Sequence, residues 1–547
     1  MQQRKQRETW TTRLGVILAV TGSAVGLGNF LRFPGLAAQY GGGAFMVAYV
    51  CAFVFLGLPI AFAEWAMGRY GGMHGHNSSP GIYRVIWKNR AAPYFGVLAM
   101  IVPVGIYMYY VYIESWCLAY ATRYLLGAMN FGADAERYKQ FFEHFVGLHA
   151  HGESLSTPGE GLLGSAVFFL VVCFILNFIL IYRGLSKGIE WFCRWAMPAL
   201  VICAVIILIR VLTLGTPDPA KPDQNVLNGL GYMWNPVKTP AMLAPGEVPK
   251  SFWEGLADPE MWMKAAGQIF FSLSVGFGII ITYASYVKKD DDIALSSLTA
   301  CAGNEFCEVV LGGLITVPAA FVFLGPQIGS QLSNPFALGF MALPNVFNQM
   351  PAGQLFGFLF FFLLFLAAIT SSLSMLQPAV ALLEEGLGLN RRASVAVLGF
   401  ITAIGAAGVV IFSKDFVALD TLDFWIGTFA IYLLATFQTI LFGWILGVEK
   451  GMAELRRGAE IKIPEFYKYI IKYVTPLYLL LVFFLWLRQN FVVTSPEQNR
   501  IRQLFTDPVV GGMAVFILAV GILFALLIAQ SVKNWRRLEA SQEEIVI

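Results

Sequence analysis

Long apolar segments are the feature that most limits what this chain can form. Each of twelve apolar runs is long enough for a helix that crosses about 30 Å of hydrocarbon, which takes about 20 residues. The runs fall near residues 12–38, 43–67, 92–126, 162–182, 191–214, 262–287, 293–323, 353–383, 393–412, 424–446, 467–488 and 510–531. Only 13% of the residues are charged, against about 25% in soluble domains. We therefore expect an all-α polytopic membrane protein with twelve transmembrane helices.

The positions of Lys and Arg predict the orientation, because cytoplasmic loops carry an excess of both. The tail, the even-numbered loops and the C-terminus hold most of them, for example Arg4, Lys5, Lys288, Lys289, Arg391, Arg392, Arg536 and Arg537. Both termini are thus expected in the cytoplasm, with residues 127–160 and 215–260 outside. The net charge of +3 is close to neutral, which gives no support to a nucleic-acid partner.

The cysteines and histidines give no metal or disulfide framework. All seven cysteines lie inside apolar segments, where a thiol behaves as a small hydrophobe. His74 and His76 fall on the cytoplasmic side of the predicted topology, and His149 and His151 fall outside. The two pairs cannot form one site, and a zinc site is not expected.

Two apolar runs are interrupted by glycine in the same V-G-x-G pattern. Val25-Gly26-Leu27-Gly28 lies in the first run and Val275-Gly276-Phe277-Gly278 in the sixth, 250 residues later. Because five spans separate the two positions, the two segments must cross the membrane in opposite directions. This arrangement predicts a five-plus-five inverted repeat, with broken helices 1 and 6.

The repeat divides the chain into five parts. We expect a cytoplasmic tail at 1–11, a first repeat at 12–214, an external connection at 215–261, a second repeat at 262–447, and two further helices with the C-terminus at 448–547. Matched breaks at corresponding positions point to a transporter's central site. Close packing of small residues is the alternative explanation for each glycine motif alone.

The side chains near the breaks offer neutral oxygen ligands. Asn29 follows the first break and Ser272 precedes the second, while Asn304 lies in the seventh span and Thr370 in the eighth. Calcium sites generally recruit several carboxylates. A set of uncharged oxygens therefore favours a monovalent alkali ion.

The long stretch from Val309 to Leu383 contains no charged residue. Its middle, from Leu324 to Ala352, should face outward, yet it holds apolar residues such as Phe340. We expect residues 335–345 to dip back over the protein as an uncharged plug.

Several long motifs resemble the neurotransmitter:sodium symporter family, and its bacterial amino-acid branch in particular. They are GSAVGLGNFLRFP (22–34), EWAMGRYGG (64–72), YYVYIESW (109–116), GQIFFSLSVGFG (267–278), ITYASY (281–286), ITSS (369–372) and LDFW (422–425). They occur in the right order and cover almost the whole chain. The resemblance implies the leucine-transporter-like fold and sodium-coupled uptake of an amino acid by alternating access.

The resemblance also implies two sodium sites. The first would use the Ala24 carbonyl, Asn29, Ser272 and Asn304 with the carboxylate of the solute, and the second would use the carbonyls of Gly22, Val25 and Ala367 with the hydroxyls of Thr370 and Ser371. The family usually has Thr at the position of Ser272, and the hydroxyl is kept. Simple hydrogen bonding between helices is the alternative role for these residues.

The solute pocket carried over from the family is largely apolar. It would be formed by Ser23, Ala24, Gly26, Leu27, Gly28, Ile106, Tyr110, Phe271, Ser272, Ser274, Phe277, Ser371 and Met375. Tyr110 would donate its hydroxyl to the carboxylate of the solute. Monoamine-transporting relatives carry Asp at the position of Gly26, so its absence favours a zwitterionic amino acid. An apolar pocket discriminates by only about 1–3 kcal/mol per methylene, which leaves the preferred amino acid open.

Charged residues along the pathway are gating candidates by the same resemblance. Arg32 would face Asp423 at the outer mouth, and Arg7 would face Glu385 at the inner one. Glu308 occupies the position that is a serine beside chloride in chloride-dependent relatives. Its carboxylate would substitute for the ion, which predicts transport without chloride.

The sequence thus predicts a symporter of a neutral, apolar amino acid in the inner (plasma) membrane of a bacterium. Its expected partners are the amino acid, two sodium ions and the lipid bilayer, and a homodimer is left open. A sodium-dependent sensor or a channel-like member without net transport is the alternative. Enzyme motifs are lacking: Gly26-Leu27-Gly28 follows no strand, and there is no Walker A run.

Overall fold

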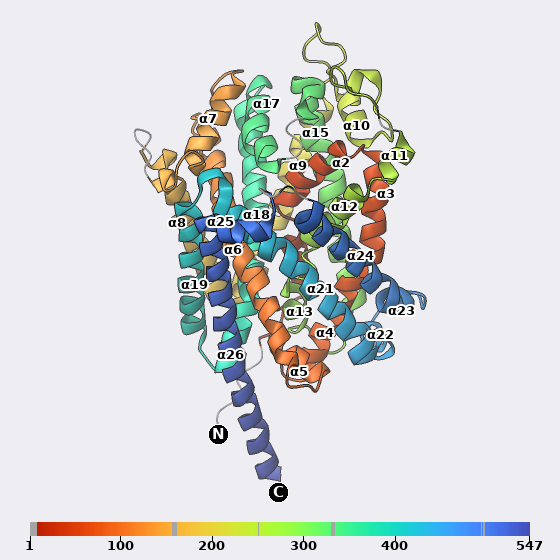
Figure 1. Cartoon of the computed structure of the whole chain (residues 1–547), viewed down its shortest axis with the longest axis vertical. Coiled ribbons are helices and arrows are strands. Elements are labelled where there is room, and N and C mark those ends of the chain that lie inside the picture. Colours follow the sequence, from red (N-terminus) through yellow and green to blue (C-terminus); the bar gives the residue numbers. More distant parts are fainter. Residues whose placement is uncertain are drawn as a thin grey trace.

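The computed structural model describes residues 8–155, 161–249, 251–329, 334–493, 495 and 498–546, and helices are the only regular elements in these ranges. Figure 1 shows most helices running along the long axis of the molecule. We call the end with α7 (Ala135–Val146), α10 (Val226–Trp234) and α17 (Leu343–Gln349) the upper face. The end with α5 (Ser79–Ile86) and α22 (Val448–Arg456) is the lower face.

The helices of the first half are α1 (Arg13–Ala24), η1 (Gly28–Arg32), α2 (Phe33–Gln39), α3 (Gly43–Ala52), η2 (Phe53–Gly57), α4 (Leu58–Met73), η3 (Ala92–Phe95), α6 (Gly96–Leu125), η4 (Glu153–Leu155), η5 (Gly161–Gly164), α8 (Ala166–Tyr182), η6 (Leu185–Glu190) and α9 (Trp191–Leu212). Then come η7 (Pro240–Met242), α11 (Phe252–Leu256), α12 (Pro259–Leu273), α13 (Ile279–Ala284), α14 (Ile293–Glu305), η8 (Phe306–Gly312), α15 (Gly313–Leu324), η9 (Gly325–Ile328) and η10 (Ala337–Ala342). The last part holds α18 (Gly353–Leu387), α19 (Arg391–Ile411), η11 (Lys414–Phe416), α20 (Val417–Leu422), η12 (Asp423–Ala430), α21 (Ile431–Ile440), η13 (Leu441–Gly447), α23 (Tyr467–Tyr469), η14 (Ile470–Val474), α24 (Thr475–Arg488), η15 (Gln489–Val493), α25 (Arg500–Thr506) and α26 (Pro508–Val546).

Every predicted apolar run coincides with one helix or with two or three consecutive helical segments. In the described residues, nine continuous helices are long and apolar enough to cross a membrane, and the bent pair formed by α1 with η1 and α2 makes a tenth. The fourth run forms α8, which has only 17 residues. The sixth run is divided between α12 and α13. The all-helical membrane fold is therefore confirmed, while the count of twelve spans stays a prediction.

Both predicted helix breaks are present. The helix pair of the first span is bent by 52° between Ala24 and Gly28. The sixth run is interrupted between α12 and α13, where Gly276 and Gly278 have φ of 74° and 77°. Glycine adopts this left-handed conformation without steric cost. The V-G-x-G pattern thus provides the backbone freedom that the second break uses.

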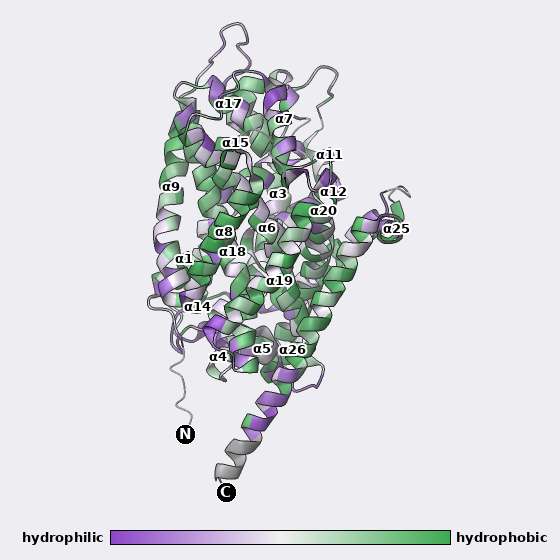
Figure 2. Cartoon of the chain, turned by 90° about the vertical axis from the view of Figure 1, so that its left-hand side faces the viewer, coloured by the Kyte–Doolittle hydropathy of each residue, from purple (hydrophilic) through white to green (hydrophobic). Residues whose placement is uncertain are grey.

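The outer surface of the helix bundle is apolar around its middle. Figure 2 shows hydrophobic residues covering much of the bundle between more polar ends. Large exposed apolar side chains include Ile175 and Ile179 on α8, Ile202 and Ile209 on α9, Phe400 on α19, and Leu518 and Ile522 on α26. A surface of this extent is costly in water. It fits a bundle whose solvent is the hydrocarbon of a bilayer.

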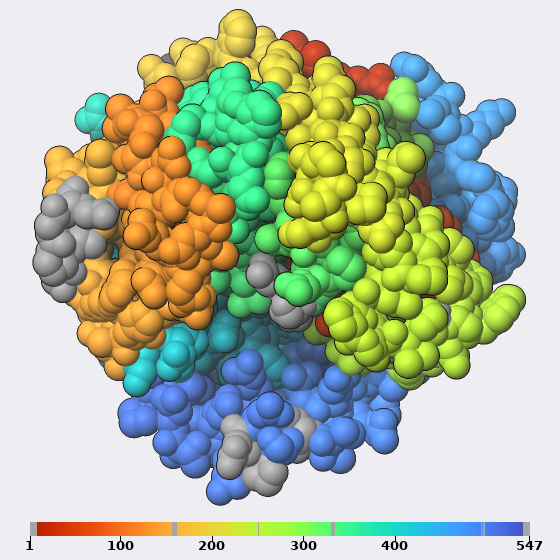
Figure 3. Space-filling model, turned by 90° about the horizontal axis from the view of Figure 1, so that it is seen from above, coloured from red at the N-terminus to blue at the C-terminus, as the bar shows by residue number. Residues whose placement is uncertain are grey.

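The predicted plug is confirmed as a buried segment on the upper face. Residues 335–345 include η10 and the start of α17, and residues 338–340 within them are buried. The ring of Phe340 packs against Trp116 at 5.7 Å and against Phe142 at 5.4 Å. Tyr120 donates a hydrogen bond to the Phe340 carbonyl at 3.0 Å. Figure 3 looks onto this face, where the segments around α7, α10 and α17 gather.

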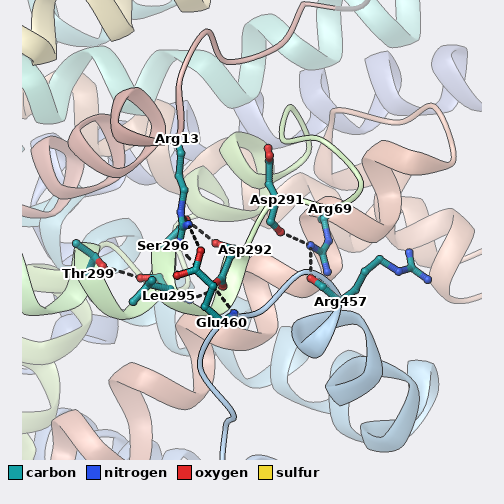
Figure 4. A network of polar contacts seen from close by, with 9 residues as sticks. All are labelled: Arg13, Arg69, Asp291, Asp292, Leu295, Ser296, Thr299, Arg457 and Glu460. Carbon is teal, nitrogen blue, oxygen red and sulfur yellow. Dashed lines mark hydrogen bonds and ion pairs between the residues drawn. The ribbon is translucent and has the colours of Figure 1, made fainter.

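The lower face is held together by a polar network. Arg13 pairs with Asp292 at 3.4 Å and with Glu460 at 3.3 Å, which links α1, α14 and the segment after α22 (Figure 4). Arg69 is fully buried and pairs with Glu454 at 2.8 Å. Arg69 also donates to the Arg457 carbonyl at 3.1 Å. These contacts close the lower side of the bundle around the start of α1.

Candidate functional site

The first break exposes backbone groups beside α18. Helix α1 ends at Ala24, and Val25 has an extended backbone with ψ of 104°. The side chain of Asn29 turns back, and its Oδ1 accepts a hydrogen bond from the Gly26 N–H at 2.8 Å. The carbonyls of residues 22–25 no longer meet the regular partners that a continuous helix would supply.

The second break meets the first one directly. Ser274 at the end of α12 is left-handed, with φ of 53°. Its hydroxyl donates to the Ser23 carbonyl at 2.9 Å. The buried acid Glu64 lies against the backbone amides of Gly276 and Gly278. The two breaks therefore share one buried polar region at the middle of the bundle.

A small pocket lies between the breaks, and it contains most of the residues predicted for the solute. Its lining consists of Ser23, Ala24, Gly26, Gly28, Asn29, Tyr110, Phe271, Ser272, Ser274, Phe277, Ser371 and Met375. Of the predicted set, Leu27 and Ile106 are not in this lining; Leu27 lines a second cavity instead. The free volume is only about 10 Å³, so the pocket is nearly closed in this conformation.

The four residues predicted for the first sodium site converge beside this pocket. Asn29 donates to Asn304 at 2.9 Å, and Asn304 donates to the Ser272 hydroxyl at 2.6 Å. In the alternative orientation, with the oxygen and nitrogen of its side-chain amide exchanged, Asn304 donates to the Ala24 carbonyl at 3.3 Å and accepts from the Ser272 hydroxyl at 2.6 Å. Asn29, Ser272 and Asn304 are at most 1% exposed. The result is a compact set of neutral oxygens that faces the pocket.

The residues predicted for the second sodium site surround the hydroxyl of Ser371. This oxygen lies 3.3 Å from the Gly22 carbonyl, 3.4 Å from the Val25 carbonyl and 3.0 Å from the Ala367 carbonyl. The Ser23 carbonyl is also close, at 3.1 Å. One hydroxyl has a single proton to donate, so the carbonyl oxygens outnumber the donor. Such a surplus of acceptors suits a cation.

Thr370 completes this group on α18. Its hydroxyl lies 3.1 Å from the Ala367 carbonyl and 3.0 Å from the Leu366 carbonyl, and it can donate to either one. A Cβ on Gly22 would lie 3.2 Å from the Thr370 Cβ. The first break therefore packs closely against α18 at this point.

Glu308 lies next to the first group of oxygens, with the partners that the sequence suggested. Its carboxylate accepts hydrogen bonds from Gln268 and Ser272, from the Tyr49 hydroxyl at 2.9 Å and from Asn304 at 3.3 Å. The buried carboxylate thus has a side-chain donor on each oxygen.

A second acid, Glu305, was not predicted. Tyr49 also lies 2.8 Å from a Glu305 oxygen, although its one proton cannot serve both acids at once. Asn304 lies 3.5 Å from the other Glu305 oxygen. Two carboxylates therefore share one tyrosine beside the first group.

Above the pocket is a larger cavity, which we call the vestibule. It has about 530 Å³ of free volume, and Arg32, Tyr109, Phe271, Asp415 and Asp423 are among its lining residues. Asp423 accepts a hydrogen bond from Tyr109 at 2.7 Å, and the Arg32 guanidinium lies 5.4 Å from the centre of the Phe271 ring. Both members of the predicted outer pair are thus in the vestibule, and no ion pair joins them among the described residues.

The predicted inner pair is only partly visible. Arg7 lies outside the described residues. Glu385 is bonded instead to His76 at 2.5 Å and to the backbone N–H groups of Asn77 and Ser78, both at 2.7 Å. Trp10 is buried near this end of the bundle: it is 5% exposed and donates to the Tyr283 carbonyl at 2.9 Å.

Two broken helices around a buried pocket, with polar clusters and a cavity on one side, define a secondary transporter. The chain belongs to the sodium:neurotransmitter symporter family, whose model matches residues 7–139 and 247–535. It is a multi-pass, sodium-dependent membrane transporter and not an enzyme.

Its relatives agree with this assignment. The chain is 28% identical to an uncharacterized sodium-dependent transporter of Methanocaldococcus jannaschii, over 97% of this chain and 99% of that protein. It is 24% identical to the sodium- and chloride-dependent GABA transporter 2 of Rattus norvegicus, over 81% of this chain and 74% of that protein. The solved structure of MhsT in complex with L-phenylalanine matches with a TM-score of 0.71 and 27% identity, covering 87% of this chain and 99% of MhsT.

Proposed function

We propose that this transporter is a symporter that couples the inward flow of Na⁺ to the uptake of a neutral, apolar amino acid. Two clusters of neutral oxygens lie beside one pocket between two helix breaks, and this placement is the main support for the proposal. A dehydrated Na⁺ can replace its lost water by such oxygens. A carboxylated solute would supply the remaining ligand of the first cluster, which couples the solute to the ion.

The pocket lining supports an amino acid as the solute. Tyr110 is positioned to bind a carboxylate, since its hydroxyl lies 3.4 Å from the Leu27 N–H at the start of the broken half-helix. Such a half-helix N-terminus attracts anions. Phe271, Phe277 and Met375 provide an apolar compartment. Since MhsT was solved with L-phenylalanine, an apolar amino acid is the proposed class.

We propose that both sodium sites are used, with the ligands named above. The first couples solute to ion, and the second joins α1 to α18. Occupancy of the second site would stabilise the arrangement in which α1 packs against α18. An ion shifts a conformational equilibrium only by its differential affinity for the two states. Here the two states are the one in which α1 packs against α18 and the one in which α1 has moved away, which would separate the carbonyls of Gly22 and Val25 from the ligands on α18.

Glu308 supports transport without chloride. Its carboxylate already supplies a buried negative group to Tyr49, Gln268, Ser272 and Asn304. A chloride ion in the same place would add a second negative charge at a high cost in desolvation. We further propose that Glu308 carries a proton on the return step, when sodium and solute have left.

Alternating access would proceed between the vestibule and the lower face. In the proposed orientation both termini are cytoplasmic, and the protein lies in the plasma membrane of a bacterium. Arg32 and Asp423 would approach each other when the vestibule closes, and Arg7 and Glu385 would pair at the inner side. A homodimer is compatible with transport by each subunit alone.

Ligand binding tests the substrate assignment directly. The purified protein in nanodiscs is screened against the twenty amino acids in NaCl and in KCl, with binding measured by scintillation proximity or calorimetry. We expect saturable binding of apolar amino acids in NaCl only, unchanged when gluconate replaces chloride. Equal binding in NaCl and KCl would refute sodium coupling, and exclusive binding of charged amino acids would refute the substrate class.

A sensor or channel-like member is the competing function, since either would bind the same ligand. The measurement that separates these functions is accumulation against a gradient, which only a coupled transporter performs.

A further inference from the structure

Two histidines and a glutamate form a cluster on the upper face, outside the transport site. His144 Nδ1 lies 2.8 Å from a Glu153 carboxylate oxygen, and the His144 and His149 rings are 4.8 Å apart. One ligand atom from each of His144, His149 and Glu153 lies within 4.8 Å of the others, the one such group of three among the described residues. His144 and Glu153 lie outside the His149-Ala150-His151 pattern, so no local pattern in the sequence identifies the cluster.

The fold brings these residues together through a chain reversal. Helix α7 ends at Val146, and Gly147 adopts the left-handed conformation with φ of 68°. The second Glu153 oxygen accepts hydrogen bonds from the N–H groups of His149 at 2.9 Å and Ala150 at 3.3 Å. The carboxylate is therefore fixed by the backbone, and its other oxygen is directed toward His144.

The donor set has the chemistry of a transition-metal site. Imidazole nitrogens and a carboxylate oxygen bind zinc at about 2.0–2.2 Å in a tetrahedral arrangement. Glu143 provides a further oxygen, 3.8 Å from His149 Nε2. The His144 and His149 side chains are 67% and 49% exposed. A metal ion can therefore enter from solvent, and binding needs only small side-chain rotations.

We propose that His144, His149 and Glu153 bind a divalent transition-metal ion, with zinc the best fit to two imidazoles and one carboxylate. An ion pair between His144 and Glu153 is the simpler explanation of the 2.8 Å contact. That ion pair does not include His149, whose ring lies against His144 and whose Nε2 is 3.8 Å from Glu143. The binding of metal does not depend on which solute the protein transports.

The loop that carries the cluster is tied to a wall of the vestibule. Ser413 donates to the Gly147 carbonyl at 2.7 Å, and the Asp415 N–H donates to the Leu148 carbonyl at 3.2 Å. Asp415 itself lines the vestibule. A metal ion that rigidifies residues 147–153 should therefore restrain this wall and slow the closure of the vestibule. This second part rests on the proposed transport function.

Binding is tested with protein purified without a polyhistidine tag and placed in nanodiscs. Zn²⁺ is titrated by calorimetry, and Co²⁺ is followed by its visible absorption. We expect one ion per chain, a tetrahedral Co²⁺ spectrum, and at least tenfold weaker binding in His144→Ala and in His149→Ala. The matched control is His151→Ala, in the same loop but outside the cluster, which should bind as the unaltered protein does.

Amino-acid binding that still depends on sodium shows that each variant is folded. If neither the unaltered protein nor the variants bind an amino acid, the metal titration can still be interpreted, because metal binding does not depend on the solute. No metal binding by the unaltered protein, or equal losses in His151→Ala and His144→Ala, would overturn the site. Zn²⁺ should slow uptake into proteoliposomes by several-fold, and much less so in His144→Ala. Zinc binding with unchanged uptake would overturn the coupling to the vestibule.

Discussion

The Ser371 hydroxyl lies 3.4 Å from the Val25 carbonyl, joining the middle of α18 to the break in the first span. Three other carbonyl oxygens lie within 3.3 Å of the same hydroxyl. Because a hydroxyl donates only one hydrogen bond, this region is rich in acceptors. It has the electrostatic character of a cation site, although it is built without a charged side chain.

Replacement of Ser371 by Ala should weaken sodium binding. The variant loses one proposed ligand, and we expect the Na⁺ concentration for half-maximal binding of the amino acid to rise about tenfold, the scale of effects around metal sites. Ser394→Ala is the control, because Ser394 is equally buried on α19 and belongs to neither cluster. The assignment fails if both variants have the same sodium dependence as the unaltered protein.

Gly26→Ala should weaken amino-acid binding. A Cβ at this position would lie 2.9 Å from the Tyr110 hydroxyl and 3.3 Å from the Ser371 hydroxyl, so it would displace groups that line the pocket. We expect affinity for the amino acid to fall by more than tenfold. Gly267→Ala on α12 is the control, since its nearest contact would be 3.9 Å away. Normal binding by Gly26→Ala would show that the solute binds elsewhere.

Glu308→Ser should make amino-acid binding dependent on chloride. The substitution removes the buried negative group but leaves Tyr49, Gln268 and Asn304 as donors for an anion. Binding should be weak in gluconate and should recover at least several-fold when chloride is added. Glu305→Gln is the informative comparison, because Glu305 shares Tyr49 and lies outside the proposed anion position. If chloride has no effect on Glu308→Ser, the proposed substitution of chloride by the carboxylate is wrong.

Trp10→Ala should open the pathway toward the lower face. The side chain loses its hydrogen bond to the Tyr283 carbonyl, and Cys193, which lies on α9 beside Gly22, should become accessible. Maleimide labelling of Cys193, followed by peptide mass spectrometry, should be several-fold faster than in the unaltered protein. Trp253→Ala is the control, since Trp253 is 75% exposed on α11. Unchanged labelling in Trp10→Ala would mean that Trp10 does not close this route.

The helix breaks and most of the pocket could be predicted from the sequence because they depend on local features. Glycines mark the second break, where φ is positive at Gly276 and Gly278, and the family motifs place Tyr110 and Phe271 beside it. Ile106 lies outside these motifs and was assigned to the pocket by the family resemblance alone. The structure buries it outside the lining, because the pocket is nearly closed here.

Contacts that depend on tertiary structure were not predictable in the same way. Glu305 and Glu308 are three residues apart, a spacing that makes their side chains neighbours on a helix. Only the packing of α3, which carries Tyr49, brings one hydroxyl within reach of both carboxylates. Glu385 bonds to His76 and the following backbone through the packing of a loop on the lower face that no local pattern identifies. The cluster of His144, His149 and Glu153 likewise depends on the reversal of the chain at Gly147.

The most direct test of the account is uptake into proteoliposomes with an imposed ion gradient. Vesicles loaded with KCl are diluted into NaCl or KCl, each containing one labelled apolar amino acid that binds in nanodiscs. We predict that the amino acid accumulates above its external concentration in NaCl only, and that a sodium ionophore abolishes this accumulation. Sodium-dependent binding without accumulation above the external level would contradict coupled transport and favour a sensor or a channel-like protein.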